Sequence, residues 1–153
     1  MGRKQAREGT MKLLYQMELN EDFSQEAIDC YLFNFTFDKK EEEYILDMTN
    51  KIKDNLEVID EHIENHIKGW GISRLAKIDL AVLRIAICEV LYREDIPIQV
   101  SINEAIEIVK KYSLEDSFKF VNGVLGGFVR AIDNTKWNVE DKYECTGLKS
   151  IRG

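Results

Sequence analysis

The sequence predicts an all-α protein. Its apolar residues recur at spacings of three and four along most of the chain, the repeat of one helix face, whereas a half-buried strand needs a spacing of two. Pro97 is the only proline, and clusters of Gly or Ser are few, so long segments can remain helical without interruption. With 153 residues, 44% of them hydrophobic, the chain is long enough to bury a core without disulfides or metals.

The first helix is expected over residues 3–19. An apolar stripe marks its buried face: Ala6, Thr10, Leu13, Leu14 and Met17. Its basic residues lie outside this stripe and are expected to remain solvent-accessible: Arg3, Lys4, Arg7 and Lys12. A shorter second helix follows Ser24, with apolar residues at helical spacing as far as Phe35.

A long helix is expected over residues 38–69. It opens with Asp38 and Glu41 at the spacing of a capping box, in which each side chain accepts a hydrogen bond from the other residue's backbone amide. Apolar residues then continue at spacings of three and four to Ile67, so the helix would contain about 31 residues and measure roughly 46 Å.

The middle of the sequence predicts the centre of the molecule. The Gly-Trp-Gly segment at residues 69–71 is expected to break the long helix. Ser73 is expected to cap a short turn that runs to Lys77, and Asp79 to cap the next helix. Residues 80–92 carry apolar side chains on almost every face, so this helix is expected to be the buried centre.

Two more helices are expected after Pro97. Ser101 and Glu104 repeat the capping-box spacing and predict a helix over residues 101–111. The last helix is expected to begin at residue 115 or 116 and to end near residue 132.

Three glycines interrupt the expected last helix. Gly123, Gly126 and Gly127 each cost about 1 kcal/mol relative to alanine inside a helix, so something must compensate. Close approach of another helix is the first explanation, and a direct role in binding a ligand is the alternative. Residues 133–153 show no clear periodicity and are expected to form a loose C-terminal tail.

Charge is distributed unevenly along the chain. The formal net charge is −7, which by itself argues against nucleic acid as a partner. Residues 1–12, however, carry four basic side chains against one acidic, a net of +3, whereas residues 18–64 carry fifteen acids against four lysines, a net of −11. The basic end could therefore meet RNA, and the acidic flank could meet a basic partner.

Several classes of protein have little support in the sequence. Cys30, Cys88 and Cys145 are odd in number and lack CxxC spacing, so a disulfide framework or a zinc knuckle is not predicted. No apolar run reaches the roughly 18 residues of a membrane span, and the start lacks the apolar core of a signal peptide. A cytoplasmic protein without membrane contact is expected.

An enzyme is not predicted either. His62 and His66 stand one helical turn apart, but they lack the HExxH arrangement, and two partly solvated histidines are the simpler interpretation. No phosphate-binding glycine loop and no nucleophile-histidine set can be identified. We therefore expect no catalytic residue, no metal and no cofactor.

RNA binding is better supported by the residues of the sequence. Single-stranded RNA is commonly held by a basic rim along its phosphates and by aromatic rings on which bases stack. Arg3, Lys4 and Arg7 could supply the rim, Tyr15 and Phe120 the stacking. Two further residues near the start of the last helix could add charge and an amide that recognises a base edge: Lys119 and Asn122. Each aromatic residue could instead belong to the core, and Asn122 could satisfy backbone groups.

Several motifs give the chain a resemblance to the NusB family of bacterial transcription antitermination proteins. They are Arg-Lys-x-Ala-Arg-Glu at 3–8, Leu-Tyr-Gln-Met-Glu-Leu at 14–19, Leu-Arg-Ile-Ala at 83–86, Ile-Asn-Glu-Ala-Ile-Glu at 102–107, and Asp-Ser-Phe-Lys-Phe-Val-Asn-Gly-Val-Leu at 116–125. The resemblance runs from Arg3 to about Ile132. It implies two helical bundles that share a central buried helix, here a single RNA-binding domain over 1–132 with sub-bundles of about 1–69 and 70–132.

The resemblance also implies a function. Proteins of this family are non-catalytic adaptors that bind the boxA element of nascent RNA, notably in ribosomal RNA leaders, together with the ribosomal protein NusE. Their complex joins the elongating RNA polymerase and suppresses termination. The matching positions imply seven RNA-binding residues: Arg3, Lys4, Arg7, Tyr15, Lys119, Phe120 and Asn122. Asp116 and Ser117 lie at the edge of that site, and Asp79 is implied to bind the protein partner.

The sequence departs from the family pattern in three places and leaves one alternative open. Gln5 shortens the basic run, Lys4 replaces an arginine and so loses bidentate phosphate geometry, and residues 133–153 match no motif. The alternative is a helical interaction or dimerisation module that binds no RNA. A homodimer is compatible with either interpretation.

Overall fold

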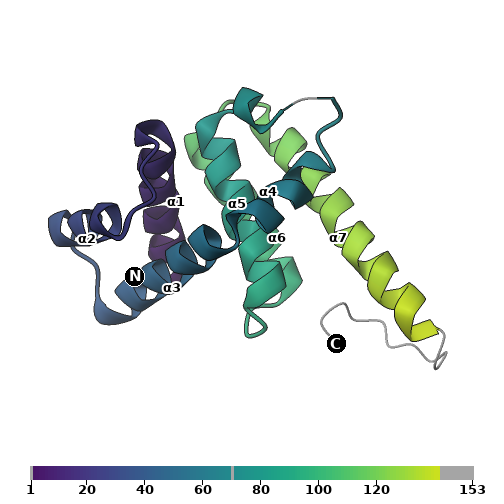
Figure 1. Ribbon diagram of the computed structural model, residues 1–153, viewed down its shortest axis with the longest axis horizontal. Coiled ribbons are helices and arrows are strands. Elements are labelled where there is room, and N and C mark those ends of the chain that lie inside the picture. Colours follow the sequence, from purple (N-terminus) through teal and green to yellow (C-terminus); the bar gives the residue numbers. More distant parts are fainter. Residues whose placement is uncertain (1, 70, 142–153) are drawn as a thin grey trace.

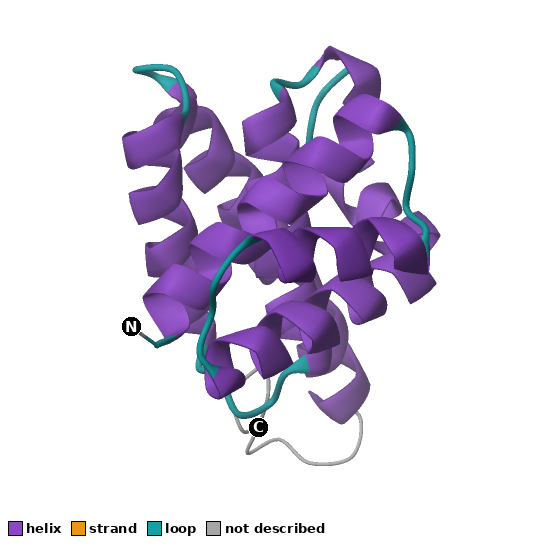
Figure 2. Cartoon of the chain, turned by 90° about the vertical axis from the view of Figure 1, so that its left-hand side faces the viewer, coloured by secondary structure: helices purple, strands orange, loops and turns teal. Residues whose placement is uncertain are grey.

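The computed structural model describes residues 2–69 and 71–141. Over these residues the chain forms seven α-helices and one short 3-10 turn: α1 (Arg3–Asn20), α2 (Gln25–Asn34), α3 (Lys39–Asp54), α4 (Leu56–Glu64), η1 (Ile72–Arg74), α5 (Lys77–Tyr92), α6 (Ile98–Tyr112) and α7 (Ser117–Asp141). The described part contains no strand, which confirms the all-α prediction (Figure 1 and Figure 2). None of the helices described combines the length and apolarity needed to cross a membrane.

Helix α5 is the centre of the molecule, as the sequence predicts. It contacts α1, α3 and α4 on the amino-terminal part of the chain and α6 and α7 on the carboxy-terminal part. Figure 1 shows it between these two groups of helices. Every residue from Asp79 to Val90 is buried, including three charged ones. The two groups therefore share one core through α5.

The first three helices begin as the sequence predicts. The expected apolar stripe of α1 is buried, from Ala6 to Met17. The Ser24 side chain accepts a hydrogen bond from the backbone of Ala27 and caps α2. Asp38 and Glu41 form the reciprocal capping box at the start of α3. Local side-chain chemistry thus determines where α2 and α3 start.

The prediction of one long helix over 38–69 is wrong, because the structure has two helices there, α3 and α4. Asn55 separates α3 from α4, and its backbone adopts φ −123° and ψ 26°, outside the helical region. Its side-chain amide donates to the Lys51 carbonyl at 2.8 Å and competes with the continuing helix. The apolar spacing nevertheless continues across the break, because Ile59 and Ile63 of α4 are buried and α4, like α3, packs against α5.

Three expected helix caps are also wrong. No capping hydrogen bond from Ser73 occurs at η1, and α5 begins at Lys77, so Asp79 lies inside its first turn. Helix α6 begins at Ile98, directly after Pro97, and Ser101 therefore lies within it. The physical reason is tertiary: the Ser101 hydroxyl donates a hydrogen bond of 2.7 Å to buried Glu89, and Asp79 accepts one from Ser113, directly after α6.

Helix α7 continues to Asp141 and so passes the end expected near Ile132. The loose tail expected over 133–153 is therefore helical as far as residue 141, and residues 142–153 lie outside the described part, as do Trp70 and Cys145. The glycines of α7 differ from one another. A Cβ added at Gly127 would lie 2.9 Å from His66 Nδ1, so close packing explains that glycine.

Candidate nucleic-acid interface

Arg7 is buried, which corrects the expectation that all basic residues of α1 are solvent-accessible. It is 4% exposed, and its guanidinium donates to both carboxylate oxygens of Glu89 on α5, at 2.8 and 3.2 Å. Although burial opposes the charge, the hydrogen bond and the charge of Glu89 raise the pKa of Arg7. In this conformation the Arg7 side chain holds α1 on α5, and it is not placed to touch a ligand.

Glu89 is fully buried and receives two more hydrogen bonds. The hydroxyls of Tyr44 on α3 and Ser101 on α6 both donate to it. Burial and the charge of Glu89 raise the pKa of Tyr44 well above its ordinary value, so this hydroxyl remains a donor. We call these four residues the Glu89 network. It connects α1, α3, α5 and α6 and orients the helix that carries the expected RNA-binding residues.

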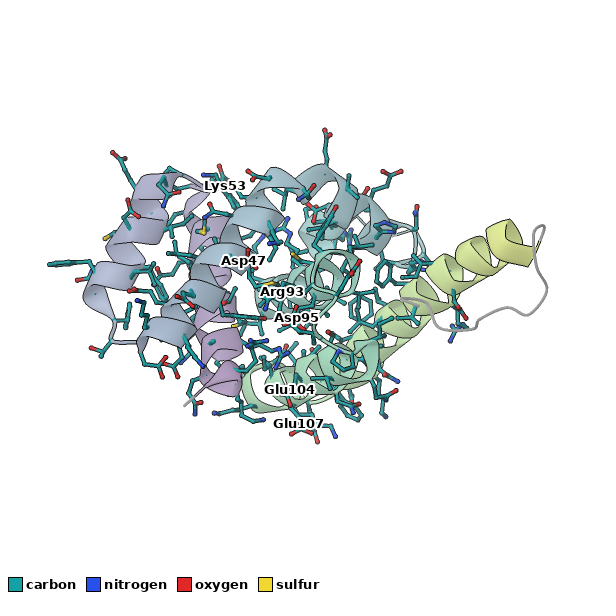
Figure 3. All side chains as sticks on the ribbon, turned by 90° about the horizontal axis from the view of Figure 1, so that it is seen from below. Asp47, Lys53, Arg93, Asp95, Glu104 and Glu107 are labelled. Atoms are coloured by element: carbon teal, nitrogen blue, oxygen red, sulfur yellow. The ribbon has the colours of Figure 1, made fainter. Side chains whose placement is uncertain are left out.

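Arg3 and Lys4 are exposed at the start of α1 but point toward different neighbours. The guanidinium carbon of Arg3 lies 4.8 Å from the centre of the Tyr44 ring. Arg3 also lines a shallow pocket together with Arg93 and Asp47. Arg93 is itself held between Asp47 and Asp95 (Figure 3). Lys4 pairs with Glu104 of α6 at 3.4 Å, beside Glu107 in Figure 3.

The carboxy-terminal end of α6 places a lysine–tyrosine cluster beside α1. Lys12 Nζ and Lys111 Nζ lie 5.2 and 5.1 Å from the centre of the Tyr112 ring. Glu8 anchors this cluster, because it accepts hydrogen bonds from the Tyr112 hydroxyl at 2.8 Å and from Lys111 at 3.1 Å. The pKa of Glu8 is lowered, since these donors outweigh the effect of partial burial.

The start of α7 continues this surface. Lys110 Nζ lies 5.0 Å and Lys119 Nζ 6.0 Å from the centre of the Phe118 ring. Because Lys110 precedes Lys111 on α6, the two clusters adjoin. We call this surface the lysine–aromatic strip: Lys12, Lys110, Lys111, Tyr112, Phe118 and Lys119. Its lysines alternate with half-buried rings from α1 to α7, an arrangement suited to phosphates and bases.

Tyr15 lies at the α1 end of the strip. It is half-buried and lines a groove of about 500 Å³ together with Lys12, Phe35 and Phe37. Tyr31, which lines the same groove, donates its hydroxyl to the Gly9 carbonyl at 2.9 Å. The Tyr15 ring is therefore not sealed in the core.

Phe120 and Lys119 lie at the α7 end. Both line an open hollow between α7 and the segment after α4, and Lys119 belongs to the strip as well. Phe120 is half-buried, Lys119 is exposed over 72% of its side chain, and Asn122 is exposed. The structure thus places Lys119 and Phe120 beside each other. Helix α6 bridges them to Tyr15, whereas Arg3 and Arg7 point elsewhere.

Asp79, the expected partner-binding residue, is buried. Its carboxylate accepts a hydrogen bond from the Ser113 hydroxyl at 2.7 Å, and the Ser113 oxygen in turn accepts one from the Ser117 hydroxyl at 3.0 Å. This chain of contacts fixes the turn between α6 and α7, and with it the end of the strip. Direct contact of the Asp79 side chain with a partner would require this corner to open.

His62 and His66 are the two residues that the sequence offered as possible metal ligands. His62 packs edge-on against Phe128, with ring centres 5.0 Å apart, and burial lowers its pKa. In the part of the chain that the structure describes, no three His, Cys, Asp or Glu side chains come together as metal ligands. His66 instead packs beside Gly127 and lines the hollow near Phe120.

Five residues of the strip were missed as RNA-binding candidates in the sequence: Lys12, Lys110, Lys111, Tyr112 and Phe118. Lys-Lys-Tyr ends α6 and Ser-Phe-Lys begins α7, so both segments combine cations with aromatic rings. Lys110 and Lys111 lie in the last turn of α6, where cations interact favourably with the helix dipole. This structural role is sufficient to explain them, so the sequence gives no separate sign of RNA binding.

Comparison with known proteins gives a consistent family. The model of the NusB family matches residues 4–130. A transcription antitermination protein NusB from Acetivibrio thermocellus is 47% identical over 130 residues, covering 85% of this chain and 90% of that protein. The corresponding protein from Ruminiclostridium cellulolyticum is 49% identical over 125 residues, covering 82% and 86%.

Solved structures of NusB proteins are similar to this fold. NusB of T. maritima superposes with a TM-score of 0.78 at 37% identity, covering 85% of this chain and 92% of that one. A crystal structure of the antitermination factors NusB and NusE in complex with dsRNA contains a chain with a TM-score of 0.75 at 28% identity, covering 84% and 96%. Each of these matches covers most of both chains.

Proposed function

The chain belongs to the NusB family, and we propose that it acts as a transcription antitermination factor that binds boxA RNA of nascent transcripts, notably ribosomal RNA leaders. In this proposal it binds the RNA together with the ribosomal protein NusE and joins the elongating RNA polymerase. The lysine–aromatic strip is the observation that carries the RNA part. The role is that of a non-catalytic adaptor in the cytoplasm.

The strip suits an unpaired transcript because it offers both kinds of contact that single strands use. Its lysines release counterions when they bind phosphates. Rings such as Tyr112 and Phe118 lie between lysines and can stack on bases. Among the seven residues implied by the motifs, Lys119, Phe120 and Tyr15 lie on or next to this surface, and Asn122 is exposed. Lys4 lies on the same side of α1 through its contact with Glu104 on α6.

Arg7, Arg3 and Asp79 take indirect roles in the proposal. The Glu89 network lets Arg7 hold α1 against α5, so its loss would displace the strip. Arg3 extends basic charge around the start of α1. Asp79 fixes the corner between α6 and α7 through Ser113, so its loss would disturb RNA and partner binding together.

NusE is proposed as the protein partner for two reasons. A solved relative with 28% identity forms a complex with NusE and dsRNA. In addition, the acidic surplus of residues 18–64 in the amino-terminal half complements a basic protein.

A salt-dependent titration tests the proposal. Binding to boxA RNA and to a scrambled RNA is measured with and without NusE, for the unsubstituted protein and for a Lys12→Ala, Lys119→Ala double variant. We expect a preference for boxA, and a salt dependence shallower by about 0.7 per lost phosphate contact in the double variant. Lys53→Ala on α3 (Figure 3) is the control, because it removes a lysine outside the strip, and it should match the parent slope. Equal slopes in all three proteins would contradict the proposal.

Exposed apolar side chains at the ends of α1 and α2 favour a second candidate, self-association. Phe33 is exposed over 88% of its area, and Leu19 and Phe35 over about half. Such a patch commonly marks a protein interface. Sedimentation with and without boxA RNA separates the two: a stable dimer that Phe33→Ala dissociates, and that ignores RNA, would identify an interaction module without RNA binding.

A further inference from the structure

A hollow of about 430 Å³ lies between α7 and the segment that follows α4. It is lined by His66, Ile67, Lys68, Lys119, Phe120, Gly123 and Val124. The segment from His66 to Lys68 belongs to none of the family motifs in the sequence, so three of these seven lining residues are new to the proposed RNA site. The hollow adjoins the strip, because Lys119 lines both.

Gly123 is the least expected residue in the lining. Glycine is a poor helix former, and here it stands well inside α7. Close packing does not explain it, because a Cβ added at Gly123 would meet no atom within 4 Å. Gly127 on the same helix differs, since His66 leaves no room for a Cβ there. Packing therefore requires glycine at 127, whereas at 123 the missing side chain leaves the hollow open.

The chemistry of the lining fits a nucleotide. Ile67, Phe120 and Val124 supply an apolar wall, and Lys68 and Lys119 are exposed cations beside it. No acidic residue is among the lining residues described, and Asp116, 3.9 Å from Lys119, is the acid that pairs with one of these lysines. An apolar wall with two cations in the same lining matches a base whose flanking phosphates are negative.

We propose that this hollow receives one unpaired base of the bound RNA, packed against Phe120 and Val124, with its flanking phosphates on Lys68 and Lys119. Gly123 keeps the space open, and His66 closes one side. The inference rests on the proposed RNA-binding function and specifies it, since a base held within a duplex stack could not enter. A base that leaves the strip at Lys119 enters the hollow directly.

Filling the hollow tests the inference. Gly123→Leu places a side chain in the space, and Gly126→Leu is the matched control, because a Cβ there meets at 3.3 Å only the movable end of Arg130. Affinity for boxA RNA is measured for both, and thermal melting by circular dichroism checks folding. We expect Gly123→Leu to weaken binding by about tenfold or more, the loss typical of one stacked base, and Gly126→Leu by less than about twofold.

An abasic scan identifies the base itself. In the unsubstituted protein, removing one particular base of the RNA should weaken binding about as much as Gly123→Leu does. In Gly123→Leu the same abasic RNA should cause no further loss. Additive losses would overturn the inference, and so would parent-like affinity of Gly123→Leu.

Lys68→Ala provides a test that does not depend on helix α7. The exposed Lys68 side chain should contribute one phosphate contact, so its loss should reduce the salt slope by about 0.7. An unchanged slope would overturn the inference even if Gly123→Leu failed to fold. These failures differ from failure of the proposed function, in which the unsubstituted protein itself would not distinguish boxA from scrambled RNA.

Discussion

Two parts of the molecule use basic residues from the same helix in opposite ways. Arg7 on α1 lies in the Glu89 network, buried and doubly hydrogen-bonded. Lys12, less than two turns further on, is exposed and lies over Tyr112 in the lysine–aromatic strip. One positive charge therefore orients the helix and the other is available to a ligand. A basic run in a sequence can contain both kinds.

The helical repeat accounts for the difference. Arg7 precedes Thr10 by three residues and Leu14 by seven, so it lies on the buried face of α1. A guanidinium can occupy that position because Glu89 offers two acceptors that match its planar fork. Lys12 falls on the opposite face, where its long stem carries the ammonium group over the Tyr112 ring.

The largest effect on the free energy of unfolding should come from removing Arg7, the buried member of the Arg7 and Lys12 pair. Arg7→Ala would leave the Glu89 charge buried without its main partner, so we expect a loss of about 3–5 kcal/mol in the free energy of unfolding. Lys12→Ala, in an exposed position, should change it by less than about 0.5 kcal/mol. Urea denaturation at neutral pH measures both. Similar urea midpoints for Arg7→Ala and Lys12→Ala would contradict the idea that Arg7 is structural and Lys12 is not.

A smaller effect should follow from shortening the strip without touching the network. Phe118→Ala removes a stacking surface between Lys110 and Lys119, and we expect the affinity for boxA RNA to fall by about 1–3 kcal/mol with the helix content unchanged. Phe33→Ala on α2 removes an equal ring outside the strip and serves as the control in the same titration. A larger loss for Phe33→Ala would move the RNA site to the amino-terminal half.

The smallest effect concerns the contact that anchors the strip. Tyr112→Phe keeps the ring but removes the hydrogen bond to Glu8, so stability should fall by about 1 kcal/mol while RNA affinity stays the same. Because the folded-state pKa of Glu8 is lowered, its stabilising contacts are present above the ordinary pKa of 4.5 and are lost as the pH falls through the lowered value. The difference between Tyr112→Phe and the parent should therefore shrink in acid. A difference that grows in acid would rule out Glu8 as the anchor.

Local signals predicted much of this fold. Ser24 and the Asp38–Glu41 pair cap their helices as expected, and the even apolar coverage of residues 80–92 identified the centre. The errors arise where a distant group competes with a local one. Ser101 has the spacing of a cap, but buried Glu89 takes its hydroxyl, and Asn55 interrupts an apolar repeat that continues on both sides of it.

The candidate site was less predictable for the same reason. Lys119 and Phe120 line one hollow and Tyr15 lines another groove. The residues between them come from the end of α6 and become neighbours of α1 only through the fold. Gly123 and Gly127 look alike in the sequence, and only the position of His66 distinguishes them. Which charge is buried likewise depends on Glu89, 82 positions away from Arg7.

Photo-crosslinking tests the central claim most directly. A boxA RNA carrying 4-thiouridine is bound to the protein in the presence of NusE and irradiated, and the crosslinked peptides are identified by mass spectrometry. The account predicts crosslinks between residues 110 and 123, with further ones near Lys12 and Tyr15. Crosslinks confined to α2 and α3, with none at the end of α6 or the start of α7, would contradict it.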